Sequence, residues 1–362
     1  MNYIGSKYSL LKFIDDSISQ VIDKDSQIFC DIFAGTGVVG LHYKKKGYQI
    51  ISNDWQYYSY ILNKHYIQNH KELEFAGLVN DLSELSNAKL SNRKNIICDY
   101  LNDLPAIEGF VYKEFCPNET CTRKYFSSEN GKRCDAIRTK IENWKNENKI
   151  NENEYYFLLT SLLESIDKVA NTASVYGAFL KQYKKSALQP LNLQAAKLYI
   201  NDNEHIVYNH NANDLIQNIE ADIVYIDPPY NHRQYATNYH VLESIAKYDT
   251  PQLYGKTGLR EYNFQKSKYC SKSLVKTEFA DLIKNAKSKY IFLSYNNEGL
   301  LSFQDIKEIL QEKGRYGYFE QTYSRYKADN NRQYSHHLTI EYLHYCIVDN
   351  HSKNSTKPIE II

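Results

Sequence analysis

A glycine-rich turn near the N-terminus is the sequence feature that most restricts the fold. The apolar run 27–33 is typical of a buried parallel strand, and it leads directly into the GxGxxG pattern at 35–40, which opens a predicted helix. Glycines here permit a tight turn and let backbone N–H groups approach a ligand, and Asp54, 19 positions after Gly35, is suited to ribose hydroxyls. The turn predicts an α/β fold that binds an adenosine-containing cofactor. It leaves open a nicotinamide dinucleotide, S-adenosyl-L-methionine or a purely structural turn.

A second motif, Asp227-Pro228-Pro229-Tyr230, directly follows the apolar run 222–226. Two prolines fix φ and remove two backbone donors, so the loop is rigid and its carbonyl groups are free to face a ligand. A carboxylate and a carbonyl that accept both hydrogens of an aryl amine would favour a pyramidal, attacking nitrogen, and Asp227 and the Pro228 carbonyl fit these roles. Tyr230 offers an aromatic face on which a base can stack, worth about 1–3 kcal/mol. The alternative is a proline-rich turn that only closes a strand.

The remaining pattern predicts a doubly wound Rossmann-like sheet, mostly parallel, with an antiparallel edge hairpin. Further strands are expected at 48–52, 290–295, 317–323 and 337–346, and helices at 10–21 and 274–287. Between 65 and 203 strand signals are few and helical ones several, notably over 155–183, which predicts an inserted, mostly helical module. The expected division is therefore a sheet domain (1–64 and 204–350), a mostly helical insertion (65–203) and a polar tail (351–362).

Basic residues concentrate in two stretches, although the formal net charge of the whole chain is only +1. The segment 251–290 carries nine lysines and arginines against three acidic residues, a local charge of +6. The loop-rich stretch expected at 116–140 mixes six basic residues with Tyr125 and Phe126. Both stretches suit contacts with nucleic acid, and a solvated surface is the alternative.

Together these motifs resemble the Dam-like, alpha-group DNA adenine-N6 methyltransferases, over nearly the whole chain and in the same order. The resemblance implies that S-adenosyl-L-methionine is the methyl donor and that an adenine flips out of duplex DNA for direct attack on its N6 amine. The catalytic residues would be Asp227, Pro228 and Tyr230, with 294–297 near the target base. The donor would be bound by Tyr3, Lys7, Asp31, Phe33, Gly35, Gly37, Asp54, Asp227 and, where the family often has an Asp, by Asn211.

The DNA contacts are divided by the chemistry of the side chains. Arg123, Arg133 and Arg138 in the insertion are predicted to contact bases, since arginine suits bidentate guanine contacts. Lys266, Lys268 and Lys272 are predicted to contact backbone phosphates near the flipped base. Three alternatives remain open: an RNA adenine or guanine amino-methyltransferase, an inactive DNA-binding regulator on the same fold, and a nicotinamide-dependent dehydrogenase.

The seven cysteines are odd in number and not densely spaced, which favours a reducing compartment. Cys116, Cys121 and Cys134 lack a nearby fourth ligand, so no metal site is expected. The N-terminus has no secretory pattern and no stretch suits a membrane span, so we expect a cytoplasmic monomer that acts on double-stranded DNA without a membrane partner. Neither the recognised DNA sequence nor the presence of a paired restriction endonuclease can be read from the sequence.

Overall fold

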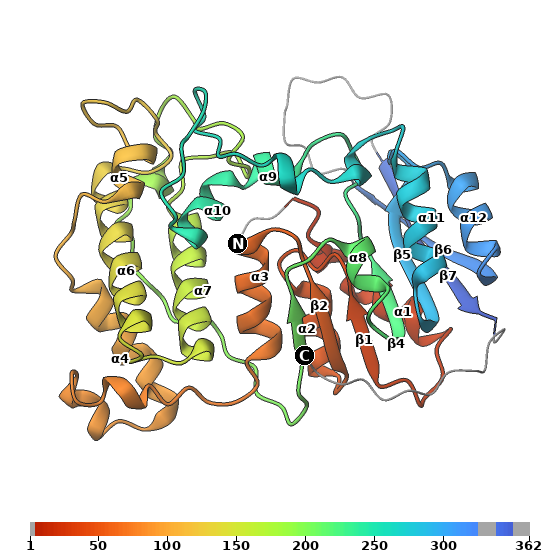
Figure 1. Ribbon diagram of the computed structural model, residues 1–362, viewed down its shortest axis with the longest axis horizontal. Helices are drawn as coiled ribbons and strands as arrows, with labels where there is room; N and C mark the ends of the chain where they lie inside the picture. Colours follow the sequence, from red (N-terminus) through yellow and green to blue (C-terminus); the bar gives the residue numbers. More distant parts are fainter. Residues whose placement is uncertain (1–3, 325–337, 350–362) are drawn as a thin grey trace.

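The computed structural model describes residues 4–324 and 338–349, and within them a seven-stranded mixed sheet forms one half of the molecule (Figure 1). The strand order is β3-β2-β1-β4-β5-β7-β6. Neighbouring strands from β3 to β5 pair in parallel, whereas β7 is antiparallel to both β5 and β6. The strands are β1 (Ile28–Asp31), β2 (Gln49–Asn53), β3 (Ile206–Tyr208), β4 (Ala221–Ile226), β5 (Ser288–Asn296), β6 (Gly314–Ser324) and β7 (Leu338–Val348). The predicted α/β class and its antiparallel edge hairpin are confirmed. The three-residue strand β3 was not predicted.

Helices cover both faces of this sheet, because alternate residues of the central strands point to opposite sides. On one face, Phe29 and Tyr225 share a hydrophobic cluster with residues of α1 (Leu11–Ser19) and α2 (Val38–Lys45). On the other face, Cys30 and Val224 share a cluster with residues of three further helices. These helices are α8 (Ala212–Ile216), α11 (Val275–Asn285) and α12 (Phe303–Gln311). The predicted helices at 10–21 and 274–287 correspond to α1 and α11.

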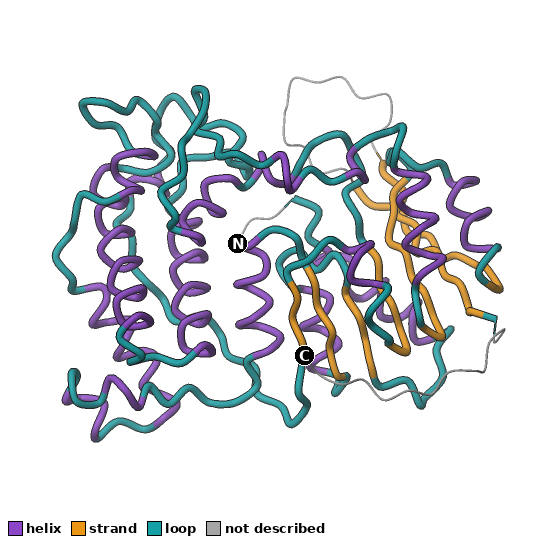
Figure 2. Tube along the Cα trace, viewed as in Figure 1, coloured by secondary structure: helices purple, strands orange, loops and turns teal. Residues whose placement is uncertain are grey.

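The chain between β2 and β3 is mostly helical and forms the other half of the molecule (Figure 2). It begins with α3 (Tyr57–Asn63) and the π-helical turn η2 (Lys64–Gln68). Its other α-helices are α4 (Leu90–Asn102), α5 (Phe110–Phe115), α6 (Ser128–Asn146) and α7 (Glu152–Lys168). Its short 3-10 turns are η3 (Ala76–Leu78), η4 (Ser83–Ser86) and η5 (Lys185–Leu188). The structure therefore has a helical segment where the sequence predicted one.

Two expectations within this segment are wrong in detail. The helix expected over 155–183 ends at Lys168, because the side chain of Asn171 donates hydrogen bonds to the carbonyls of Lys124 and Leu180 and holds the chain in a loop. The stretch 116–140 is a loop only in its first half, since α6 begins at Ser128 with the side chain of Ser127 as its N-cap.

One hydrophobic cluster joins the predicted insertion 65–203 to elements on either side of it in the sequence. It contains Tyr58 and Ile61 of α3, Leu159 of α7, and Leu242 and Ile245 of α10 (His240–Lys247), which follows the short helix α9 (Tyr235–Asn238). In Figure 1, α10 lies beside α7 and α3. The packing unit therefore extends past the expected boundaries at 65 and 203. The tail 351–362 lies outside the described residues.

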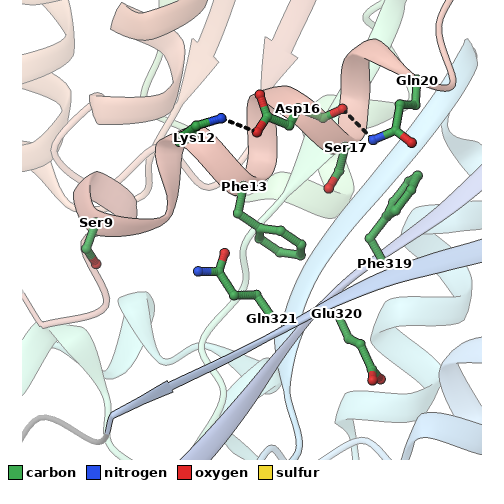
Figure 3. A pocket seen from close by; sticks show the side chains of 9 residues that line it. All are labelled: Ser9, Lys12, Phe13, Asp16, Ser17, Gln20, Phe319, Glu320 and Gln321. Carbon is green, nitrogen blue, oxygen red and sulfur yellow. Dashed lines mark hydrogen bonds and ion pairs between the residues drawn. The ribbon is translucent and has the colours of Figure 1, made fainter.

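Among the described residues, no helix is long and apolar enough to cross a bilayer. A surface pocket of about 550 Å³ lies between α1 and β6, with Phe13 and Phe319 among its lining residues (Figure 3). Lys12 and Asp16 at its rim form an ion pair with one another. None of the predicted site residues lines this pocket, so the site must be sought elsewhere.

Candidate active site

The glycine-rich turn and the Asp227 motif lie side by side at one edge of the sheet. Strands β1 and β4 are parallel neighbours, with Asp31 opposite Tyr225. The glycine turn follows β1 and Asp227 follows β4, so both emerge at the carboxyl edge of the sheet. Ligands of open α/β sheets bind at this edge, where the order of the strands reverses.

The glycine turn is fastened to the end of β2. Gly35 and Gly37 have φ values of 52° and 75°, and a Cβ atom on Gly37 would lie 2.7 Å from Oδ1 of Asn63. The two carboxylate oxygens of Asp54 accept hydrogen bonds from the backbone N–H groups of Gly35 and Gln56, each at 2.8 Å. Burial raises the pKa of Asp54 to about 7, although both of these hydrogen bonds lower it. The turn and Asp54 thus form one rigid cradle.

Asp31, the last residue of β1, is 1% exposed. Its Oδ1 atom has no hydrogen-bond partner among the described residues. Burial and the nearby carboxylate of Asp227 raise its pKa well above the usual range. A buried acceptor without a partner is costly, so this oxygen marks a place where a ligand can supply a donor.

Asp227 belongs to a buried polar cluster. Its Oδ1 atom lies 2.6 Å from the hydroxyl of Tyr230 and 3.2 Å from Nζ of Lys7. Burial raises the pKa of Asp227 to about 6, opposed by Lys7 and the Tyr230 hydrogen bond and reinforced by Glu341. Burial also disfavours the charged form of Lys7, but the carboxylates of Asp227 and Glu341 outweigh it, and the pKa of Lys7 is raised. The cluster therefore favours the charged form of Lys7 beside a carboxylate whose pKa burial has raised.

Tyr230 is held by its hydroxyl group. Lys7 donates a hydrogen bond to that oxygen, and the single phenolic hydrogen faces Asp227, Glu341 and the Ser294 carbonyl. The Lys7 ammonium also lies 4.6 Å from the centre of the Tyr230 ring. Burial raises the pKa of Tyr230 well above the usual range, so the group stays a neutral phenol.

A small pocket opens beside this cradle at the ends of β1, β2 and β3. Phe33, Trp55, Asn211 and Tyr269 are among its lining residues. Asn211 is the N-cap of α8, and its Oδ1 atom accepts a hydrogen bond from the backbone of Asn213 at 2.9 Å. The side-chain carbonyl oxygen of Asn211, a predicted donor-binding residue, is therefore already engaged in capping a helix.

Comparison with known proteins decides what kind of site this is. Residues 3–309 match the model of the D12 class N6 adenine-specific DNA methyltransferases. The chain is 50% identical over 348 residues to the type II methyltransferase M.NlaIII of Neisseria lactamica, covering 95% of this chain and 98% of that protein. Over the full length of this chain, it is 40% identical to the type II methyltransferase M.FokI of Planomicrobium okeanokoites, and the match spans 55% of that protein. The chain is also 36% identical to the type II methyltransferase M.CviAII of Paramecium bursaria Chlorella virus 1.

The chain belongs to the D12 class of adenine-specific DNA methyltransferases. Its relatives are named type II methyltransferases or modification methylases, and the protein is a site-specific DNA methyltransferase. This membership decides against the RNA methyltransferase, the inactive regulator and the dehydrogenase that the sequence left open.

Of the methyltransferase's predicted DNA contacts, the three lysines are exposed. Lys266 and Lys272 lie at the surface, and Lys268 is 58% exposed and 3.1 Å from Glu278. Lys266 follows the 3-10 turn η6 (Asn263–Gln265), Lys268 is the first residue of the 3-10 turn η7 (Lys268–Cys270), and Lys272 lies after it. This segment reaches Trp55 through a hydrogen bond from the side chain of Gln265 to the Trp55 carbonyl.

The three arginines are tied to backbone carbonyls. Arg123 donates to the carbonyls of Glu114, Gly255 and Lys256, which joins the two basic stretches into one surface. Arg133 is half-buried and donates to the carbonyls of Leu191 and Asn102.

Arg138 requires a correction. Its side chain is 1% exposed, and its guanidinium donates to the carbonyls of Ile245 and Ala246 at the end of α10 and to the carboxylate of Glu142. These last-turn carbonyls have no partner within the helix, so the buried arginine caps α10. It does not reach a surface where a base could meet it.

Cys116, Cys121 and Cys134 are buried free thiols. The thiols of Cys116 and Cys121 face the carbonyls of Val111 and Glu114, and burial raises the pKa of Cys116. Within 4–324 and 338–349 no group of three or more His, Cys, Asp or Glu side chains is arranged to hold a metal ion.

Two residues of the site, Glu341 and Trp55, were not predicted from the sequence. Tyr3, which was predicted, lies outside the described residues. Glu341 was missed although it is an acidic residue within the alternating apolar run of β7, which was the available signal. Trp55 was missed because nothing in the sequence distinguishes it from a core aromatic residue.

Proposed function

We propose that this methyltransferase transfers the methyl group of S-adenosyl-L-methionine to the N6 amine of an adenine flipped out of duplex DNA. The observation that carries the proposal is the position of Asp227 beside the glycine turn, with Asp31 at the start of that turn and Asp54 bonded to it from the end of β2. A cradle for an adenosine-containing ligand and a carboxylate suited to an amine thus share one edge of the sheet.

The residues at this edge fit the proposed donor. The unpartnered Oδ1 of Asp31 suits a cationic amino group, and the Gly35–Gly37 turn and Asp54 suit a ribose. Phe33 and Trp55 suit the adenine ring, and Asn211 would bind it through its amide nitrogen rather than its engaged oxygen. When bound, S-adenosyl-L-methionine supplies an electrophilic methyl group.

The chain's own residues prepare the nucleophile. Both contacts to Asp227, from Tyr230 and from Lys7, use Oδ1. We therefore assign Oδ2 as the acceptor of a hydrogen bond from one N–H of the target amine. The Pro228 carbonyl oxygen accepts a hydrogen bond from the other N–H. Accepting both hydrogens localises the lone pair on nitrogen, which an aryl amine otherwise delocalises into its ring. Tyr230 is anchored by its hydroxyl, which leaves its ring to contact the base.

The helical segment between β2 and β3 is proposed to recognise the target sequence. In Figure 1, the loops above α5, α6 and α7 lie with α9 along the upper side of the molecule, whereas the chain before α4 lies at the lower side. Lys266, Lys268 and Lys272 would contact phosphates near the flipped base, and Arg123 and Arg133 remain the proposed arginines of the recognition surface. We propose further that the enzyme acts as a monomer and, as the names of its relatives suggest, is paired with a restriction endonuclease.

The test is methyl transfer from isotopically labelled S-adenosyl-L-methionine to duplex DNA, single-stranded DNA and RNA of the same sequence. The expected product is N6-methyladenine at one short sequence in duplex DNA. Label on cytosine, or on RNA in preference to duplex DNA, would contradict the proposal.

A further inference from the structure

Glu341 is a buried acidic residue that reaches the active site from outside the family match. It lies on β7, opposite Asn296 of β5, whereas the match ends at residue 309. Its side chain is 1% exposed. An ionised carboxylate at such a depth is costly unless partners compensate for the lost water.

The partners of Glu341 come from three other parts of the chain. Its Oε1 atom accepts hydrogen bonds from Nζ of Lys7 at 2.8 Å and from Oγ of Ser294 at 2.6 Å, and it lies 3.0 Å from the Tyr230 hydroxyl. Its Oε2 atom has no hydrogen-bond partner among the described residues. Glu341 therefore touches both groups that hold Oδ1 of Asp227.

The charges around this site explain what Glu341 can do. The ammonium of Lys7 is shared between two carboxylates, those of Glu341 and Asp227. The other titratable groups that face them are Tyr230, Tyr225, Tyr235 and Asp31, and burial raises the pKa of each, which favours their neutral forms. If Glu341 lost its charge, Lys7 would have Asp227 as its remaining anionic partner and would compete with the target amine for that carboxylate.

We infer that Glu341 is a positioning residue: it draws Lys7 and Tyr230 to the Oδ1 side of Asp227 and so keeps the other carboxylate oxygen available to the target amine. The inference rests on the proposed role of Asp227. It concerns a residue that acts through others, since Glu341 reaches Asp227 through Lys7 and Tyr230.

The decisive variant is Glu341→Gln, which keeps the shape and one acceptor but removes the charge. Its kcat should fall about tenfold or more, as expected when a charged hydrogen-bond partner is removed, while KM for DNA and donor changes much less. The acidic limb of the kcat profile should also move to lower pH, because Glu341 raises the pKa of Asp227 and Lys7 would then lower it further. A role in stability alone would not move this limb.

Two further variants complete the experiment. Glu341→Asp retains the charge, so its acidic limb should stay near the wild-type position even if its kcat is reduced. Glu320→Gln removes an exposed acid from the neighbouring strand β6 and should change neither quantity. If Glu341→Gln folds and shows the wild-type kcat and acidic limb, or if Glu341→Asp shifts the limb as far as Glu341→Gln does, the inference is overturned.

A titration of Asp227 in the free protein separates this inference from the proposed function. NMR of labelled aspartate carboxyl groups should show a lower Asp227 pKa in Glu341→Gln than in wild type, whether or not the enzyme turns over. An unchanged pKa would refute the charge coupling. A wild-type protein that fails to methylate duplex DNA would instead contradict the proposed function.

Discussion

Asp227 is the residue on which the proposed chemistry depends, and its surroundings determine how it works. Burial pushes its pKa up to about 6, while Lys7 and Tyr230 pull the pKa back toward the ordinary value. A carboxylate in this balance is ionised at neutral pH without being far from protonation. It can therefore accept a hydrogen bond from the target amine at neutral pH.

Asp227→Asn should reduce kcat by about 10²–10³-fold, the usual range for losing one preorganised group at the reacting atoms. The amide is similar in shape but carries no charge, so DNA and donor affinities should change little. Single-turnover kinetics with calorimetric binding measurements separate these quantities. Asp214→Asn changes an exposed aspartate of α8 and serves as the matched control. Near-normal turnover in Asp227→Asn would remove this residue from the mechanism.

The wild-type pH profile gives a second check on the same residue. Because the active form is the carboxylate, kcat should be high above pH 6 and fall about tenfold per pH unit well below it. A profile that is flat from pH 5 to pH 8, with the protein folded throughout, would contradict this assignment.

At the scale of elements, side chains decide where the helices of the methyltransferase end. The π-helical turn η2 leaves carbonyl groups without ordinary helical donors, and the ammonium group of Lys44 in α2 donates hydrogen bonds to these carbonyls instead. Its Nζ atom donates to the carbonyls of Tyr66, Ile67 and Asn69 at 2.7–3.1 Å, and the residue is 2% exposed. One lysine thus attaches α2 to the start of the helical segment.

Lys44→Met should lower the free energy of unfolding by about 2–3 kcal/mol, because it removes the donor from three buried carbonyls while nearly preserving the side chain's volume. Denaturant unfolding followed by circular dichroism measures the change. Lys45→Met, at an exposed position of the same helix, removes a cation–π contact of 4.0 Å with the Tyr199 ring and should cost less than about 1 kcal/mol. Equal effects of the two variants would show that the carbonyl contacts contribute little.

On the scale of the whole molecule, the two basic stretches are neighbours rather than separate surfaces. Arg123 from the helical segment donates to the carbonyls of Gly255 and Lys256, so this loop is attached to the basic segment 251–290. The proposed base contact of Arg123 and the proposed phosphate contacts of the lysines therefore come from segments that touch each other. Such phosphate contacts carry affinity but no sequence information.

Replacing Lys266, Lys268 and Lys272 together by Gln should weaken binding to every DNA sequence alike. The slope of log K against log salt should flatten by about 0.9 for each phosphate that the protein no longer neutralises, while the methylated sequence stays the same. Filter-binding titrations at several salt concentrations and methylation mapping measure both. A triple variant of Lys24, Lys46 and Lys289, which lie near the amino ends of the strands, controls for net charge. A changed methylation site in the first variant would contradict this division of roles.

The sequence by itself determined the features that local physics governs. Apolar runs that enter a glycine turn or a pair of prolines can do little except form buried strands that end at a rigid loop, so the edge that carries Asp54 and Asp227 could be predicted. The α/β class and the antiparallel edge hairpin followed from the same periodicity.

Only the tertiary structure decided how residues far apart in the chain share a buried space. Arg138 has the side chain expected of a DNA contact, yet it donates hydrogen bonds to carbonyls at the end of α10. Glu341 cannot be distinguished in the sequence from other strand residues, and only the position of β7 places it against Lys7 and Tyr230. The short strand β3 and the shared core of α3, α7 and α10 likewise depend on long-range packing. The physical reason is that burial and the pairing of charges are properties of the assembled interior, where the cost of an unpaired polar group depends on every neighbour.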